Sequence, residues 1–175
     1  MTTAQAHPNI ALVKYWGKQE RSGNLPATPN LSITLAGLTT TTHVTGAAED
    51  TFVLNDATAD DPKLRRWLET LRGSFDIPPL AIHSSNDFPT SAGLASSASG
   101  FAALITAINA HCELGLDHAM CSEWARVGSA SAARSIFGGF VALVPPQWWA
   151  VPMAKKEHWP LEVIVAVTSL SLIHI

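Results

Sequence analysis

The chain has little charge and almost no cysteine. Only 14% of its 175 residues are Asp, Glu, Lys or Arg, and its formal net charge is −3. Because it has no basic field that would attract a phosphate backbone, we do not expect nucleic acid as a partner. Its two cysteines, Cys112 and Cys121, both fall in helical patterns, which indicates reduced thiols rather than a disulfide.

Long apolar runs are also missing. No stretch approaches the roughly 18 apolar residues of a membrane span, and the N-terminal MTTAQAHPN has no basic patch followed by an apolar run. We therefore expect a cytoplasmic protein without a membrane partner.

Several common catalytic and binding motifs are absent as well. Gly17 and Lys18 do not complete a Walker A loop, and the chain has no G-x-G-x-x-G, H-E-x-x-H, C-x-x-C or G-x-S-x-G pattern. These absences argue against the usual P-loop and dinucleotide sites, zinc proteases, zinc ribbons and serine hydrolases.

What the chain does have is enough apolar sequence to bury a core, since 47% of its residues are hydrophobic over a length typical of one domain. Leu31–Leu35 alternates at period two, and further short runs are rich in β-branched residues. These patterns predict strands over 31–35, 39–45, 51–54, 80–83, 140–144 and 163–168, the last two of the buried type.

Helix signals separate these strands. Asp61 and Pro62 predict a helix start that Gly73 ends, and Asp117 caps a helix running to Gly128. Another helix is expected from the glycine-rich stretch near residue 93 to about Cys112. Strands alternating with helices, several of them in hairpin-like succession, predict an α+β fold in one continuous domain.

The stretch FPTSAGLASSASGFAALITAI, residues 88–108, is the first candidate functional segment. It is a loop of small residues that leads into an apolar helix, and helix N-termini bind anions through unpaired N–H groups and the helix dipole. Gly93 would let a phosphate approach, while Ser91, Ser96 and Ser97 would add hydroxyl donors. Alternatively, Ser and Gly merely cap a buried helix, and composition alone does not decide.

The segment PTSAGLASSA, Pro89–Ala98, resembles the P-x-x-x-G-L-x-S-S-A loop of the GHMP small-molecule kinase superfamily. That resemblance implies a GHMP-kinase-type N-terminal domain, with the ribosomal-protein-S5-like fold of a mixed or antiparallel sheet packed with helices. It also implies that this loop binds ATP and that Ser97 contacts Mg²⁺. The implied cofactor-binding residues are Gly93, Leu94, Ala95, Ser96 and Ser97.

Two further segments, NIALVKYWGK (Asn9–Lys18) and GSASAARSIFGG (Gly128–Gly139), resemble signatures of the mevalonate diphosphate decarboxylase branch of that superfamily. The resemblance runs from about residue 6 to 168. It implies ATP-dependent decarboxylation of (R)-5-diphosphomevalonate to isopentenyl diphosphate, ADP, phosphate and CO₂ in the mevalonate pathway. It also implies a homodimer for the full-length protein.

The resemblance assigns roles to individual residues. Lys14 and Arg134 are the implied catalytic residues: Lys14 would stabilise the transferring phosphoryl group, and Arg134 would hold the substrate carboxylate with paired hydrogen bonds. The substrate-binding residues it implies are Asn9, Tyr15, Trp16, Gly17, Lys18, Ser129, Ala130, Ser131, Ala132, Ala133 and Arg134. In a competing interpretation, Tyr15 and Trp16 are core aromatics and residues 129–135 are an ordinary helix start.

Members of this family are nearly twice as long, and the segment that carries their catalytic Asp has no counterpart in this sequence. We therefore expect residues 1–168 to be the N-terminal ATP- and substrate-binding domain, inactive alone, and residues 169–175 to be a non-native tail. Two alternatives stay open. One is a related mevalonate or phosphomevalonate kinase or decarboxylase, and the other is a non-catalytic phosphate-binding module.

Overall fold

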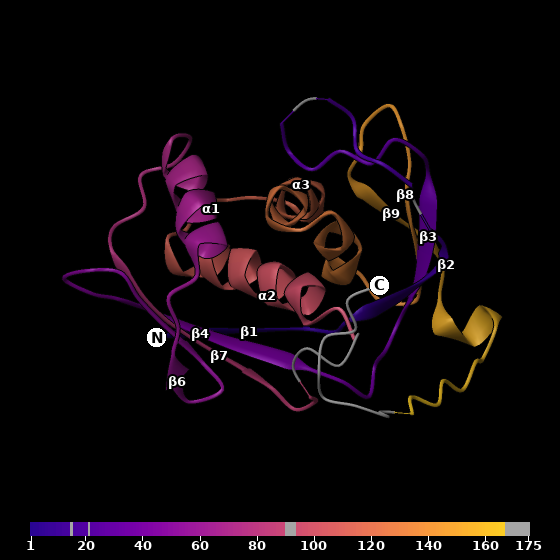
Figure 1. Ribbon diagram of the computed structural model, residues 1–175, viewed down its shortest axis with the longest axis horizontal. Coiled ribbons are helices and arrows are strands. Elements are labelled where there is room, and N and C mark those ends of the chain that lie inside the picture. The colour runs from indigo at the N-terminus through magenta and orange to yellow at the C-terminus, as the bar shows by residue number, and fades with distance from the viewer. Residues whose placement is uncertain (15, 21, 90–93, 167–175) are drawn as a thin grey trace.

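The computed structural model describes residues 1–14, 16–20, 22–89 and 94–166. Its strands form a five-stranded sheet in the order β1-β4-β7-β5-β6 and a four-stranded sheet in the order β2-β3-β8-β9 (Figure 1). The strands are β1 (Thr2–Ala6), β2 (Asn9–Val13), β3 (Asn30–Thr34), β4 (Thr40–Gly46), β5 (Thr51–Leu54), β6 (Ala57–Thr58), β7 (Leu80–Asn86), β8 (Phe140–Leu143) and β9 (Ala150–Ala154). The helices are α1 (Pro62–Arg72), α2 (Ser96–His111) and α3 (His118–Gly128), with short 3₁₀ turns η1 (Ala130–Ile136) and η2 (Lys156–His158).

The predicted α+β class is confirmed, with sheets of mainly antiparallel strands packed with helices. Within the five-stranded sheet, β4 is antiparallel to both β1 and β7, whereas β5 runs parallel to β7, so this sheet is mixed. In the four-stranded sheet each neighbouring pair is antiparallel.

The helices lie between the two sheets. Figure 1 shows α2 along the inner face of the five-stranded sheet, with α3 and η1 facing the four-stranded one. Helix α2 is buried on most sides because small and aliphatic residues surround it, and together with α1 and α3 it builds the main core. This core holds the N-terminal end of α2 in a fixed place.

Local sequence explains why the helices begin where they do. The Asp61 carboxylate accepts hydrogen bonds from the backbone N–H groups of Lys63 and Leu64, at 2.8 and 3.2 Å, and the Asp117 carboxylate accepts one from Met120 at 2.8 Å. Both predicted caps are therefore confirmed. The apolar stripe of α1 faces the core through its buried residues Leu64, Trp67, Leu68 and Leu71.

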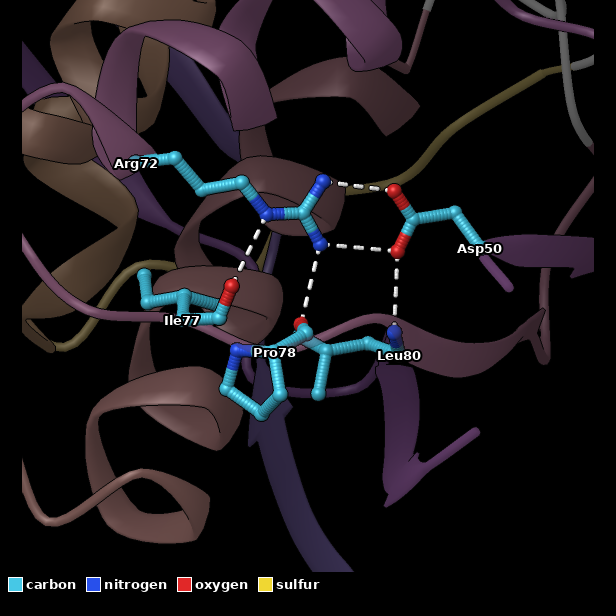
Figure 2. A network of polar contacts seen from close by, with 5 residues as sticks. All are labelled: Asp50, Arg72, Ile77, Pro78 and Leu80. Carbon is cyan, nitrogen blue, oxygen red and sulfur yellow. Dashed lines mark hydrogen bonds and ion pairs between the residues drawn. The ribbon is translucent and has the colours of Figure 1, made fainter. Parts of the chain in front are cut away.

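An ion pair fastens the end of α1 to the five-stranded sheet. The Arg72 guanidinium donates two hydrogen bonds to the Asp50 carboxylate, at 2.6 and 2.8 Å, and also bonds the carbonyls of Ile77 and Pro78 (Figure 2). Asp50 in turn accepts a bond from the Leu80 N–H at 2.8 Å. The Asp50–Arg72 pair thus joins the starts of β5 and β7 to the last residue of α1.

Some expectations fail. Residues 163–166 are not a buried strand: Ile164 is 93% exposed, and none of the described strands pairs with this run. β-branched residues favour a strand only where a neighbouring strand and a covering layer exist. Residues 167–168 and the proposed tail, 169–175, lie outside the described residues. Sequence reasoning also missed β1, β2, β6 and β9.

Cys112 and Cys121 are both free thiols, as predicted, and burial raises the pKa of the Cys121 thiol to about 11. Across the described part of the chain, we find no helix with the length and apolar character needed to span a membrane.

Candidate functional site

The start of α2 is the first part of the site. Ala95 precedes the helix in the left-handed conformation, with φ of 52°, and no side chain of the described residues caps its first turn. Leu94 is buried against Leu35 and Phe88, which anchors the loop as it enters the helix. The first-turn N–H groups therefore sit with Ser96 and Ser97 at the positive end of a rigid 16-residue helix. Gly93, also predicted to bind phosphate, lies outside the described residues.

Three serine hydroxyls connect this helix start with η1. The Ser97 Oγ lies 3.4 Å from the Ser129 Oγ, which lies 3.3 Å from the Ser131 Oγ. The predicted cofactor-binding and substrate-binding segments thus meet at a hydrogen-bonding distance, although Ser97 and Ser129 are 32 positions apart. Ligands bound by the two segments would be neighbours.

A glycine makes this meeting possible. A Cβ atom built at Gly128 would overlap the ring of Phe101 in α2. Because residue 128 has no side chain, the end of α3 lies directly against α2. This close approach places Ser129, the next residue, beside Ser97.

A cavity of about 260 Å³ opens next to Ser96 and Ser97. Aromatic and aliphatic side chains supply its apolar lining, and amide, hydroxyl and lysine groups supply polar atoms. This mixture is typical of a small-molecule site. Its lining includes Thr40, Phe52, Leu54, Lys63, Ser84, Asn86, Phe101 and Leu104.

Lys63 was missed by the sequence analysis. Its Nζ lies 5.1 Å from the centre of the Phe101 ring, inside the cavity wall. Burial, together with the nearby charge of Lys18, lowers the pKa of Lys63, whereas the Asp61 charge opposes that shift. A cation in the first turn of a helix opposes the helix dipole, but nothing in the sequence indicates that this lysine lies over Phe101.

The loop after β2 brings a second cation to the site. Lys18 donates a hydrogen bond from Nζ to the Asn24 Oδ1 at 2.8 Å, and the Asn24 amide donates to the Val127 carbonyl at 2.6 Å. Arg126 also bonds the Gly23 carbonyl. The loop is therefore tied to the end of α3, two and three residues before Ser129.

The other residues of the predicted substrate-binding segment Asn9–Lys18 differ in exposure. Lys14 and Gly17 are exposed, and Gly17 uses a positive φ of 74°. Trp16 is 80% exposed, which rules out the interpretation that it is a core aromatic. Tyr15 lies outside the described residues, so its predicted substrate contact stays a prediction.

Arg134 occupies the interior, not the surface. It is only 2% exposed, and its guanidinium donates to Ser32 Oγ at 2.9 Å, to Asn9 Oδ1 at 3.3 Å and to the Asn30 Oδ1. Asn9 also donates to the Ser131 carbonyl at 3.0 Å and to the Ser135 Oγ at 2.7 Å. The predicted orienting role of Asn9 thus has a physical basis, since it links Arg134 to η1.

The alanines predicted to bind substrate point into the core. Ala130 is 4% exposed, and Ala132 and Ala133 are fully buried. Their methyl groups pack the interior, so only their backbone could face a ligand. Small side chains here keep η1 close to the helices and to the four-stranded sheet.

The carboxylates nearest the site already serve the backbone. Asp61 lines the cavity but caps α1, and Asp87 accepts a bond from the Thr39 N–H at 2.7 Å. Within the described ranges, no group of three His, Cys, Asp or Glu residues is arranged to hold a metal ion. A Mg²⁺ ion would suit the place near Ser97 if phosphate oxygens and water supplied its other ligands.

Comparison with known proteins gives one consistent family. The model of the diphosphomevalonate decarboxylase-like N-terminal domain matches residues 6–147. A diphosphomevalonate decarboxylase of Candida albicans is 41% identical over 187 residues, covering 92% of this chain and 52% of the relative. The chain therefore spans about half the length of the curated relatives it matches.

Solved structures agree. The mevalonate diphosphate decarboxylase of Enterococcus faecalis, described for its ATP-binding mechanism, superposes with a TM-score of 0.80 at 40% identity, over 87% of this chain and 51% of that one. A structure described as MDDEF in complex with MVAPP, AMPPCP and magnesium superposes with a TM-score of 0.77 at 42% identity, over 85% and 48%.

Proposed function

The chain belongs to the diphosphomevalonate decarboxylase-like family, and from this premise we propose that it binds ATP and (R)-5-diphosphomevalonate as the N-terminal half of such an enzyme. The whole enzyme would convert this substrate to isopentenyl diphosphate, ADP, phosphate and CO₂. The observation that carries the proposal is the 3.4 Å approach of Ser97 to Ser129, because phosphoryl transfer needs the donor and the acceptor side by side. In this proposal residues 1–168 are the ATP- and substrate-binding domain.

The ATP side of the site comprises the start of α2 and the adjoining cavity. When bound, ATP with Mg²⁺ would supply the phosphoryl group. The N–H groups of the first turn and the hydroxyls of Ser96 and Ser97 would donate to phosphate oxygens, with Ser97 beside the metal. The cavity of about 260 Å³ would take the nucleoside, and Lys63 would add positive charge to its wall. The related structure with AMPPCP and magnesium supports this proposal.

The substrate side comprises η1 and the loop after β2. The hydroxyls of Ser129 and Ser131 would donate hydrogen bonds to the diphosphate. Lys14 and Lys18 would supply positive charge that attracts this negatively charged group. Lys14, exposed at the end of β2, would stabilise charge on the transferring group. Arg134 is buried beneath this surface. It would hold the substrate carboxylate only if the residues that cover its guanidinium shift.

The proton acceptor for the substrate hydroxyl is not assigned to this half. Asp61 and Asp87 both accept backbone hydrogen bonds, so neither carboxylate is placed to act as the base. We propose that the catalytic Asp comes from the second half of the enzyme, so that the 175-residue chain binds without turnover. A cytoplasmic location and a homodimer remain predictions for the whole protein.

An assay of ADP release tests the proposal. This chain would be compared with a chimaera that continues, after residue 166, with the second half of the Candida albicans relative. We expect turnover of 5-diphosphomevalonate by the chimaera alone. No turnover by a folded chimaera, or faster turnover of mevalonate or its monophosphate, would overturn the assignment and favour a phosphate-binding module or a related kinase.

A further inference from the structure

The turn that follows Lys18 is held in shape by its own backbone. The Gln19 N–H donates to the Leu25 carbonyl at 2.9 Å, which closes the turn. Within it, Gly23 and Asn24 both have left-handed backbone conformations, with φ of 91° and 52°. Glycine and asparagine adopt this conformation at lower cost than most residues. The local sequence therefore suits the path that the chain takes beside Lys18.

Arg126 fastens this turn to the rest of the molecule. It is only 8% exposed, and its guanidinium donates to the Trp148 carbonyl at 2.9 Å and to the Gly23 carbonyl. A Cβ atom built at Gly23 would lie 3.2 Å from the Nη1 atom of Arg126, so the turn lies close against the guanidinium. The position of the turn relative to α3 is thus fixed, and with it the position of Asn24.

Asn24 uses both ends of its side-chain amide. Its Nδ2 donates to the Val127 carbonyl at 2.6 Å, and its Oδ1 accepts from the Lys18 Nζ at 2.8 Å. Only this orientation of the amide allows both bonds, because a carbonyl accepts and an ammonium only donates. The bond to Val127 therefore aims the acceptor end of Asn24 at Lys18. An ammonium has three donors, so a ligand could accept from those that Asn24 does not use.

The ammonium held in this way lies near the candidate site. Val127 is two residues before Ser129, whose Oγ lies 3.4 Å from the Ser97 Oγ. Burial lowers the pKa of Lys63, in the cavity wall beside Ser97, and the charge of Lys18 lowers it further. The two cations are thus close enough to repel each other, and their proximity favours a bound anion.

We propose that Asn24 is a positioning residue that holds the Lys18 ammonium beside Ser129, so that both groups bond the diphosphate of the substrate. This inference rests on the proposed function, in which Lys18 and Ser129 bind that group. A lysine side chain loses much rotamer freedom when it binds a ligand. A hydrogen bond that orients the side chain in advance reduces this loss. Asn24 thereby raises the affinity for the substrate without touching it.

A double-mutant cycle tests this role, with calorimetric binding of 5-diphosphomevalonate to the 175-residue chain. The test variant is Asn24→Gly, which removes the amide and adopts the left-handed backbone without strain. It is made alone and together with Lys18→Met. The matched control is Glu113→Gly, at another left-handed residue, with φ of 53°, which lies beyond the opposite end of α2. Circular dichroism and urea unfolding establish that each variant folds.

We expect Asn24→Gly to weaken substrate binding about three- to tenfold and the control to leave it unchanged. In the Lys18→Met background, Asn24→Gly should have no further effect. An equal loss in both backgrounds would overturn the proposal, because Asn24 would then act on the fold and not through Lys18.

Two other outcomes separate this inference from the proposed function. Wild-type affinity of Asn24→Gly, combined with a loss for Lys18→Met, would refute the positioning role alone. Wild-type affinity of Lys18→Met would refute both the positioning role and the proposed contact of Lys18 with the substrate.

Discussion

Gly128 at the end of α3 lies directly against the ring of Phe101 in α2, in a space where a Cβ atom would overlap the ring. The contact sets how closely the two helices approach, and so how close Ser129 comes to Ser97. A residue that would be unremarkable in a helix elsewhere thereby fixes the geometry of the candidate site.

Gly128→Ala should therefore destabilise the fold, by about 1–3 kcal/mol, because overpacking displaces the ring or the helix. Gly100→Ala is the matched control. Residue 100 is also helical, but a Cβ there meets no atom within 4 Å, so we expect no loss and a gain of up to about 1 kcal/mol. Urea unfolding of the two variants measures the difference, and equal stabilities would show that α2 and α3 are not in close contact.

Arg134→Met should cost at least about 2 kcal/mol. The substitution leaves three buried acceptors, on Asn9, Asn30 and Ser32, without this donor, and each unsatisfied group carries a desolvation penalty. Arg66→Met, at an exposed position of α1, should change stability by less than about 0.5 kcal/mol. Thermal and urea unfolding provide the test. Similar losses for both variants would contradict the buried network.

The Asp50–Arg72 ion pair predicts a pH dependence (Figure 2). The hydrogen bond from Arg72 lowers the pKa of the Asp50 carboxyl, assisted by the Leu80 N–H and opposed by partial burial. Because the folded-state pKa lies below the unfolded value of about 4, the stabilisation is present above that value and is lost as the pH falls through the folded pKa.

Asp50→Asn should accordingly lower the free energy of unfolding by about 1 kcal/mol at pH 7, a modest amount because the pair is partly exposed. The difference from wild type should shrink below about pH 4. Asp60→Asn, which removes a mostly exposed ion pair with Arg65, should have almost no effect. Urea titrations between pH 3 and 7 compare the three proteins, and a constant difference across this range would refute the linkage.

Lys63→Met should weaken MgATP binding about three- to tenfold, because it removes a cation from the cavity wall, and should leave stability almost unchanged. Lys156→Met, at an exposed residue of η2, is the control and should bind like wild type. Calorimetry with MgATP and with adenosine separates the contributions. A loss that is equal for adenosine would place Lys63 at the nucleoside and not at the phosphates.

Local signals predicted the parts of this fold that local physics decides. Asp61 and Asp117 satisfy backbone donors within three residues, so their helix starts are readable from sequence. The failure at 163–166 has the opposite cause, because a strand forms only beside a neighbouring strand and none of the described strands pairs with this run. Lys63 was missed for a similar reason, since only the tertiary structure brings it over Phe101.

In the candidate site, too, the sequence predicted single segments but not how tertiary packing arranges them. Motif resemblance pointed to Ser97 and Ser129 separately, and their meeting depends on the packing of α2 against α3. The burial of Arg134 and of Ala130, Ala132 and Ala133 could not be anticipated either, since the motif gives residue types but not which side of η1 faces the core.

The most direct measurement of the central claim is calorimetric binding of MgATP and of 5-diphosphomevalonate to the 175-residue chain, its Ser97→Ala variant and its Ser129→Ala variant. We predict that Ser97→Ala weakens MgATP about tenfold and that Ser129→Ala weakens 5-diphosphomevalonate by a similar factor, each with little effect on the other ligand. Binding of both ligands with wild-type affinity by both variants would contradict a site at which these two serines bring nucleotide and substrate together.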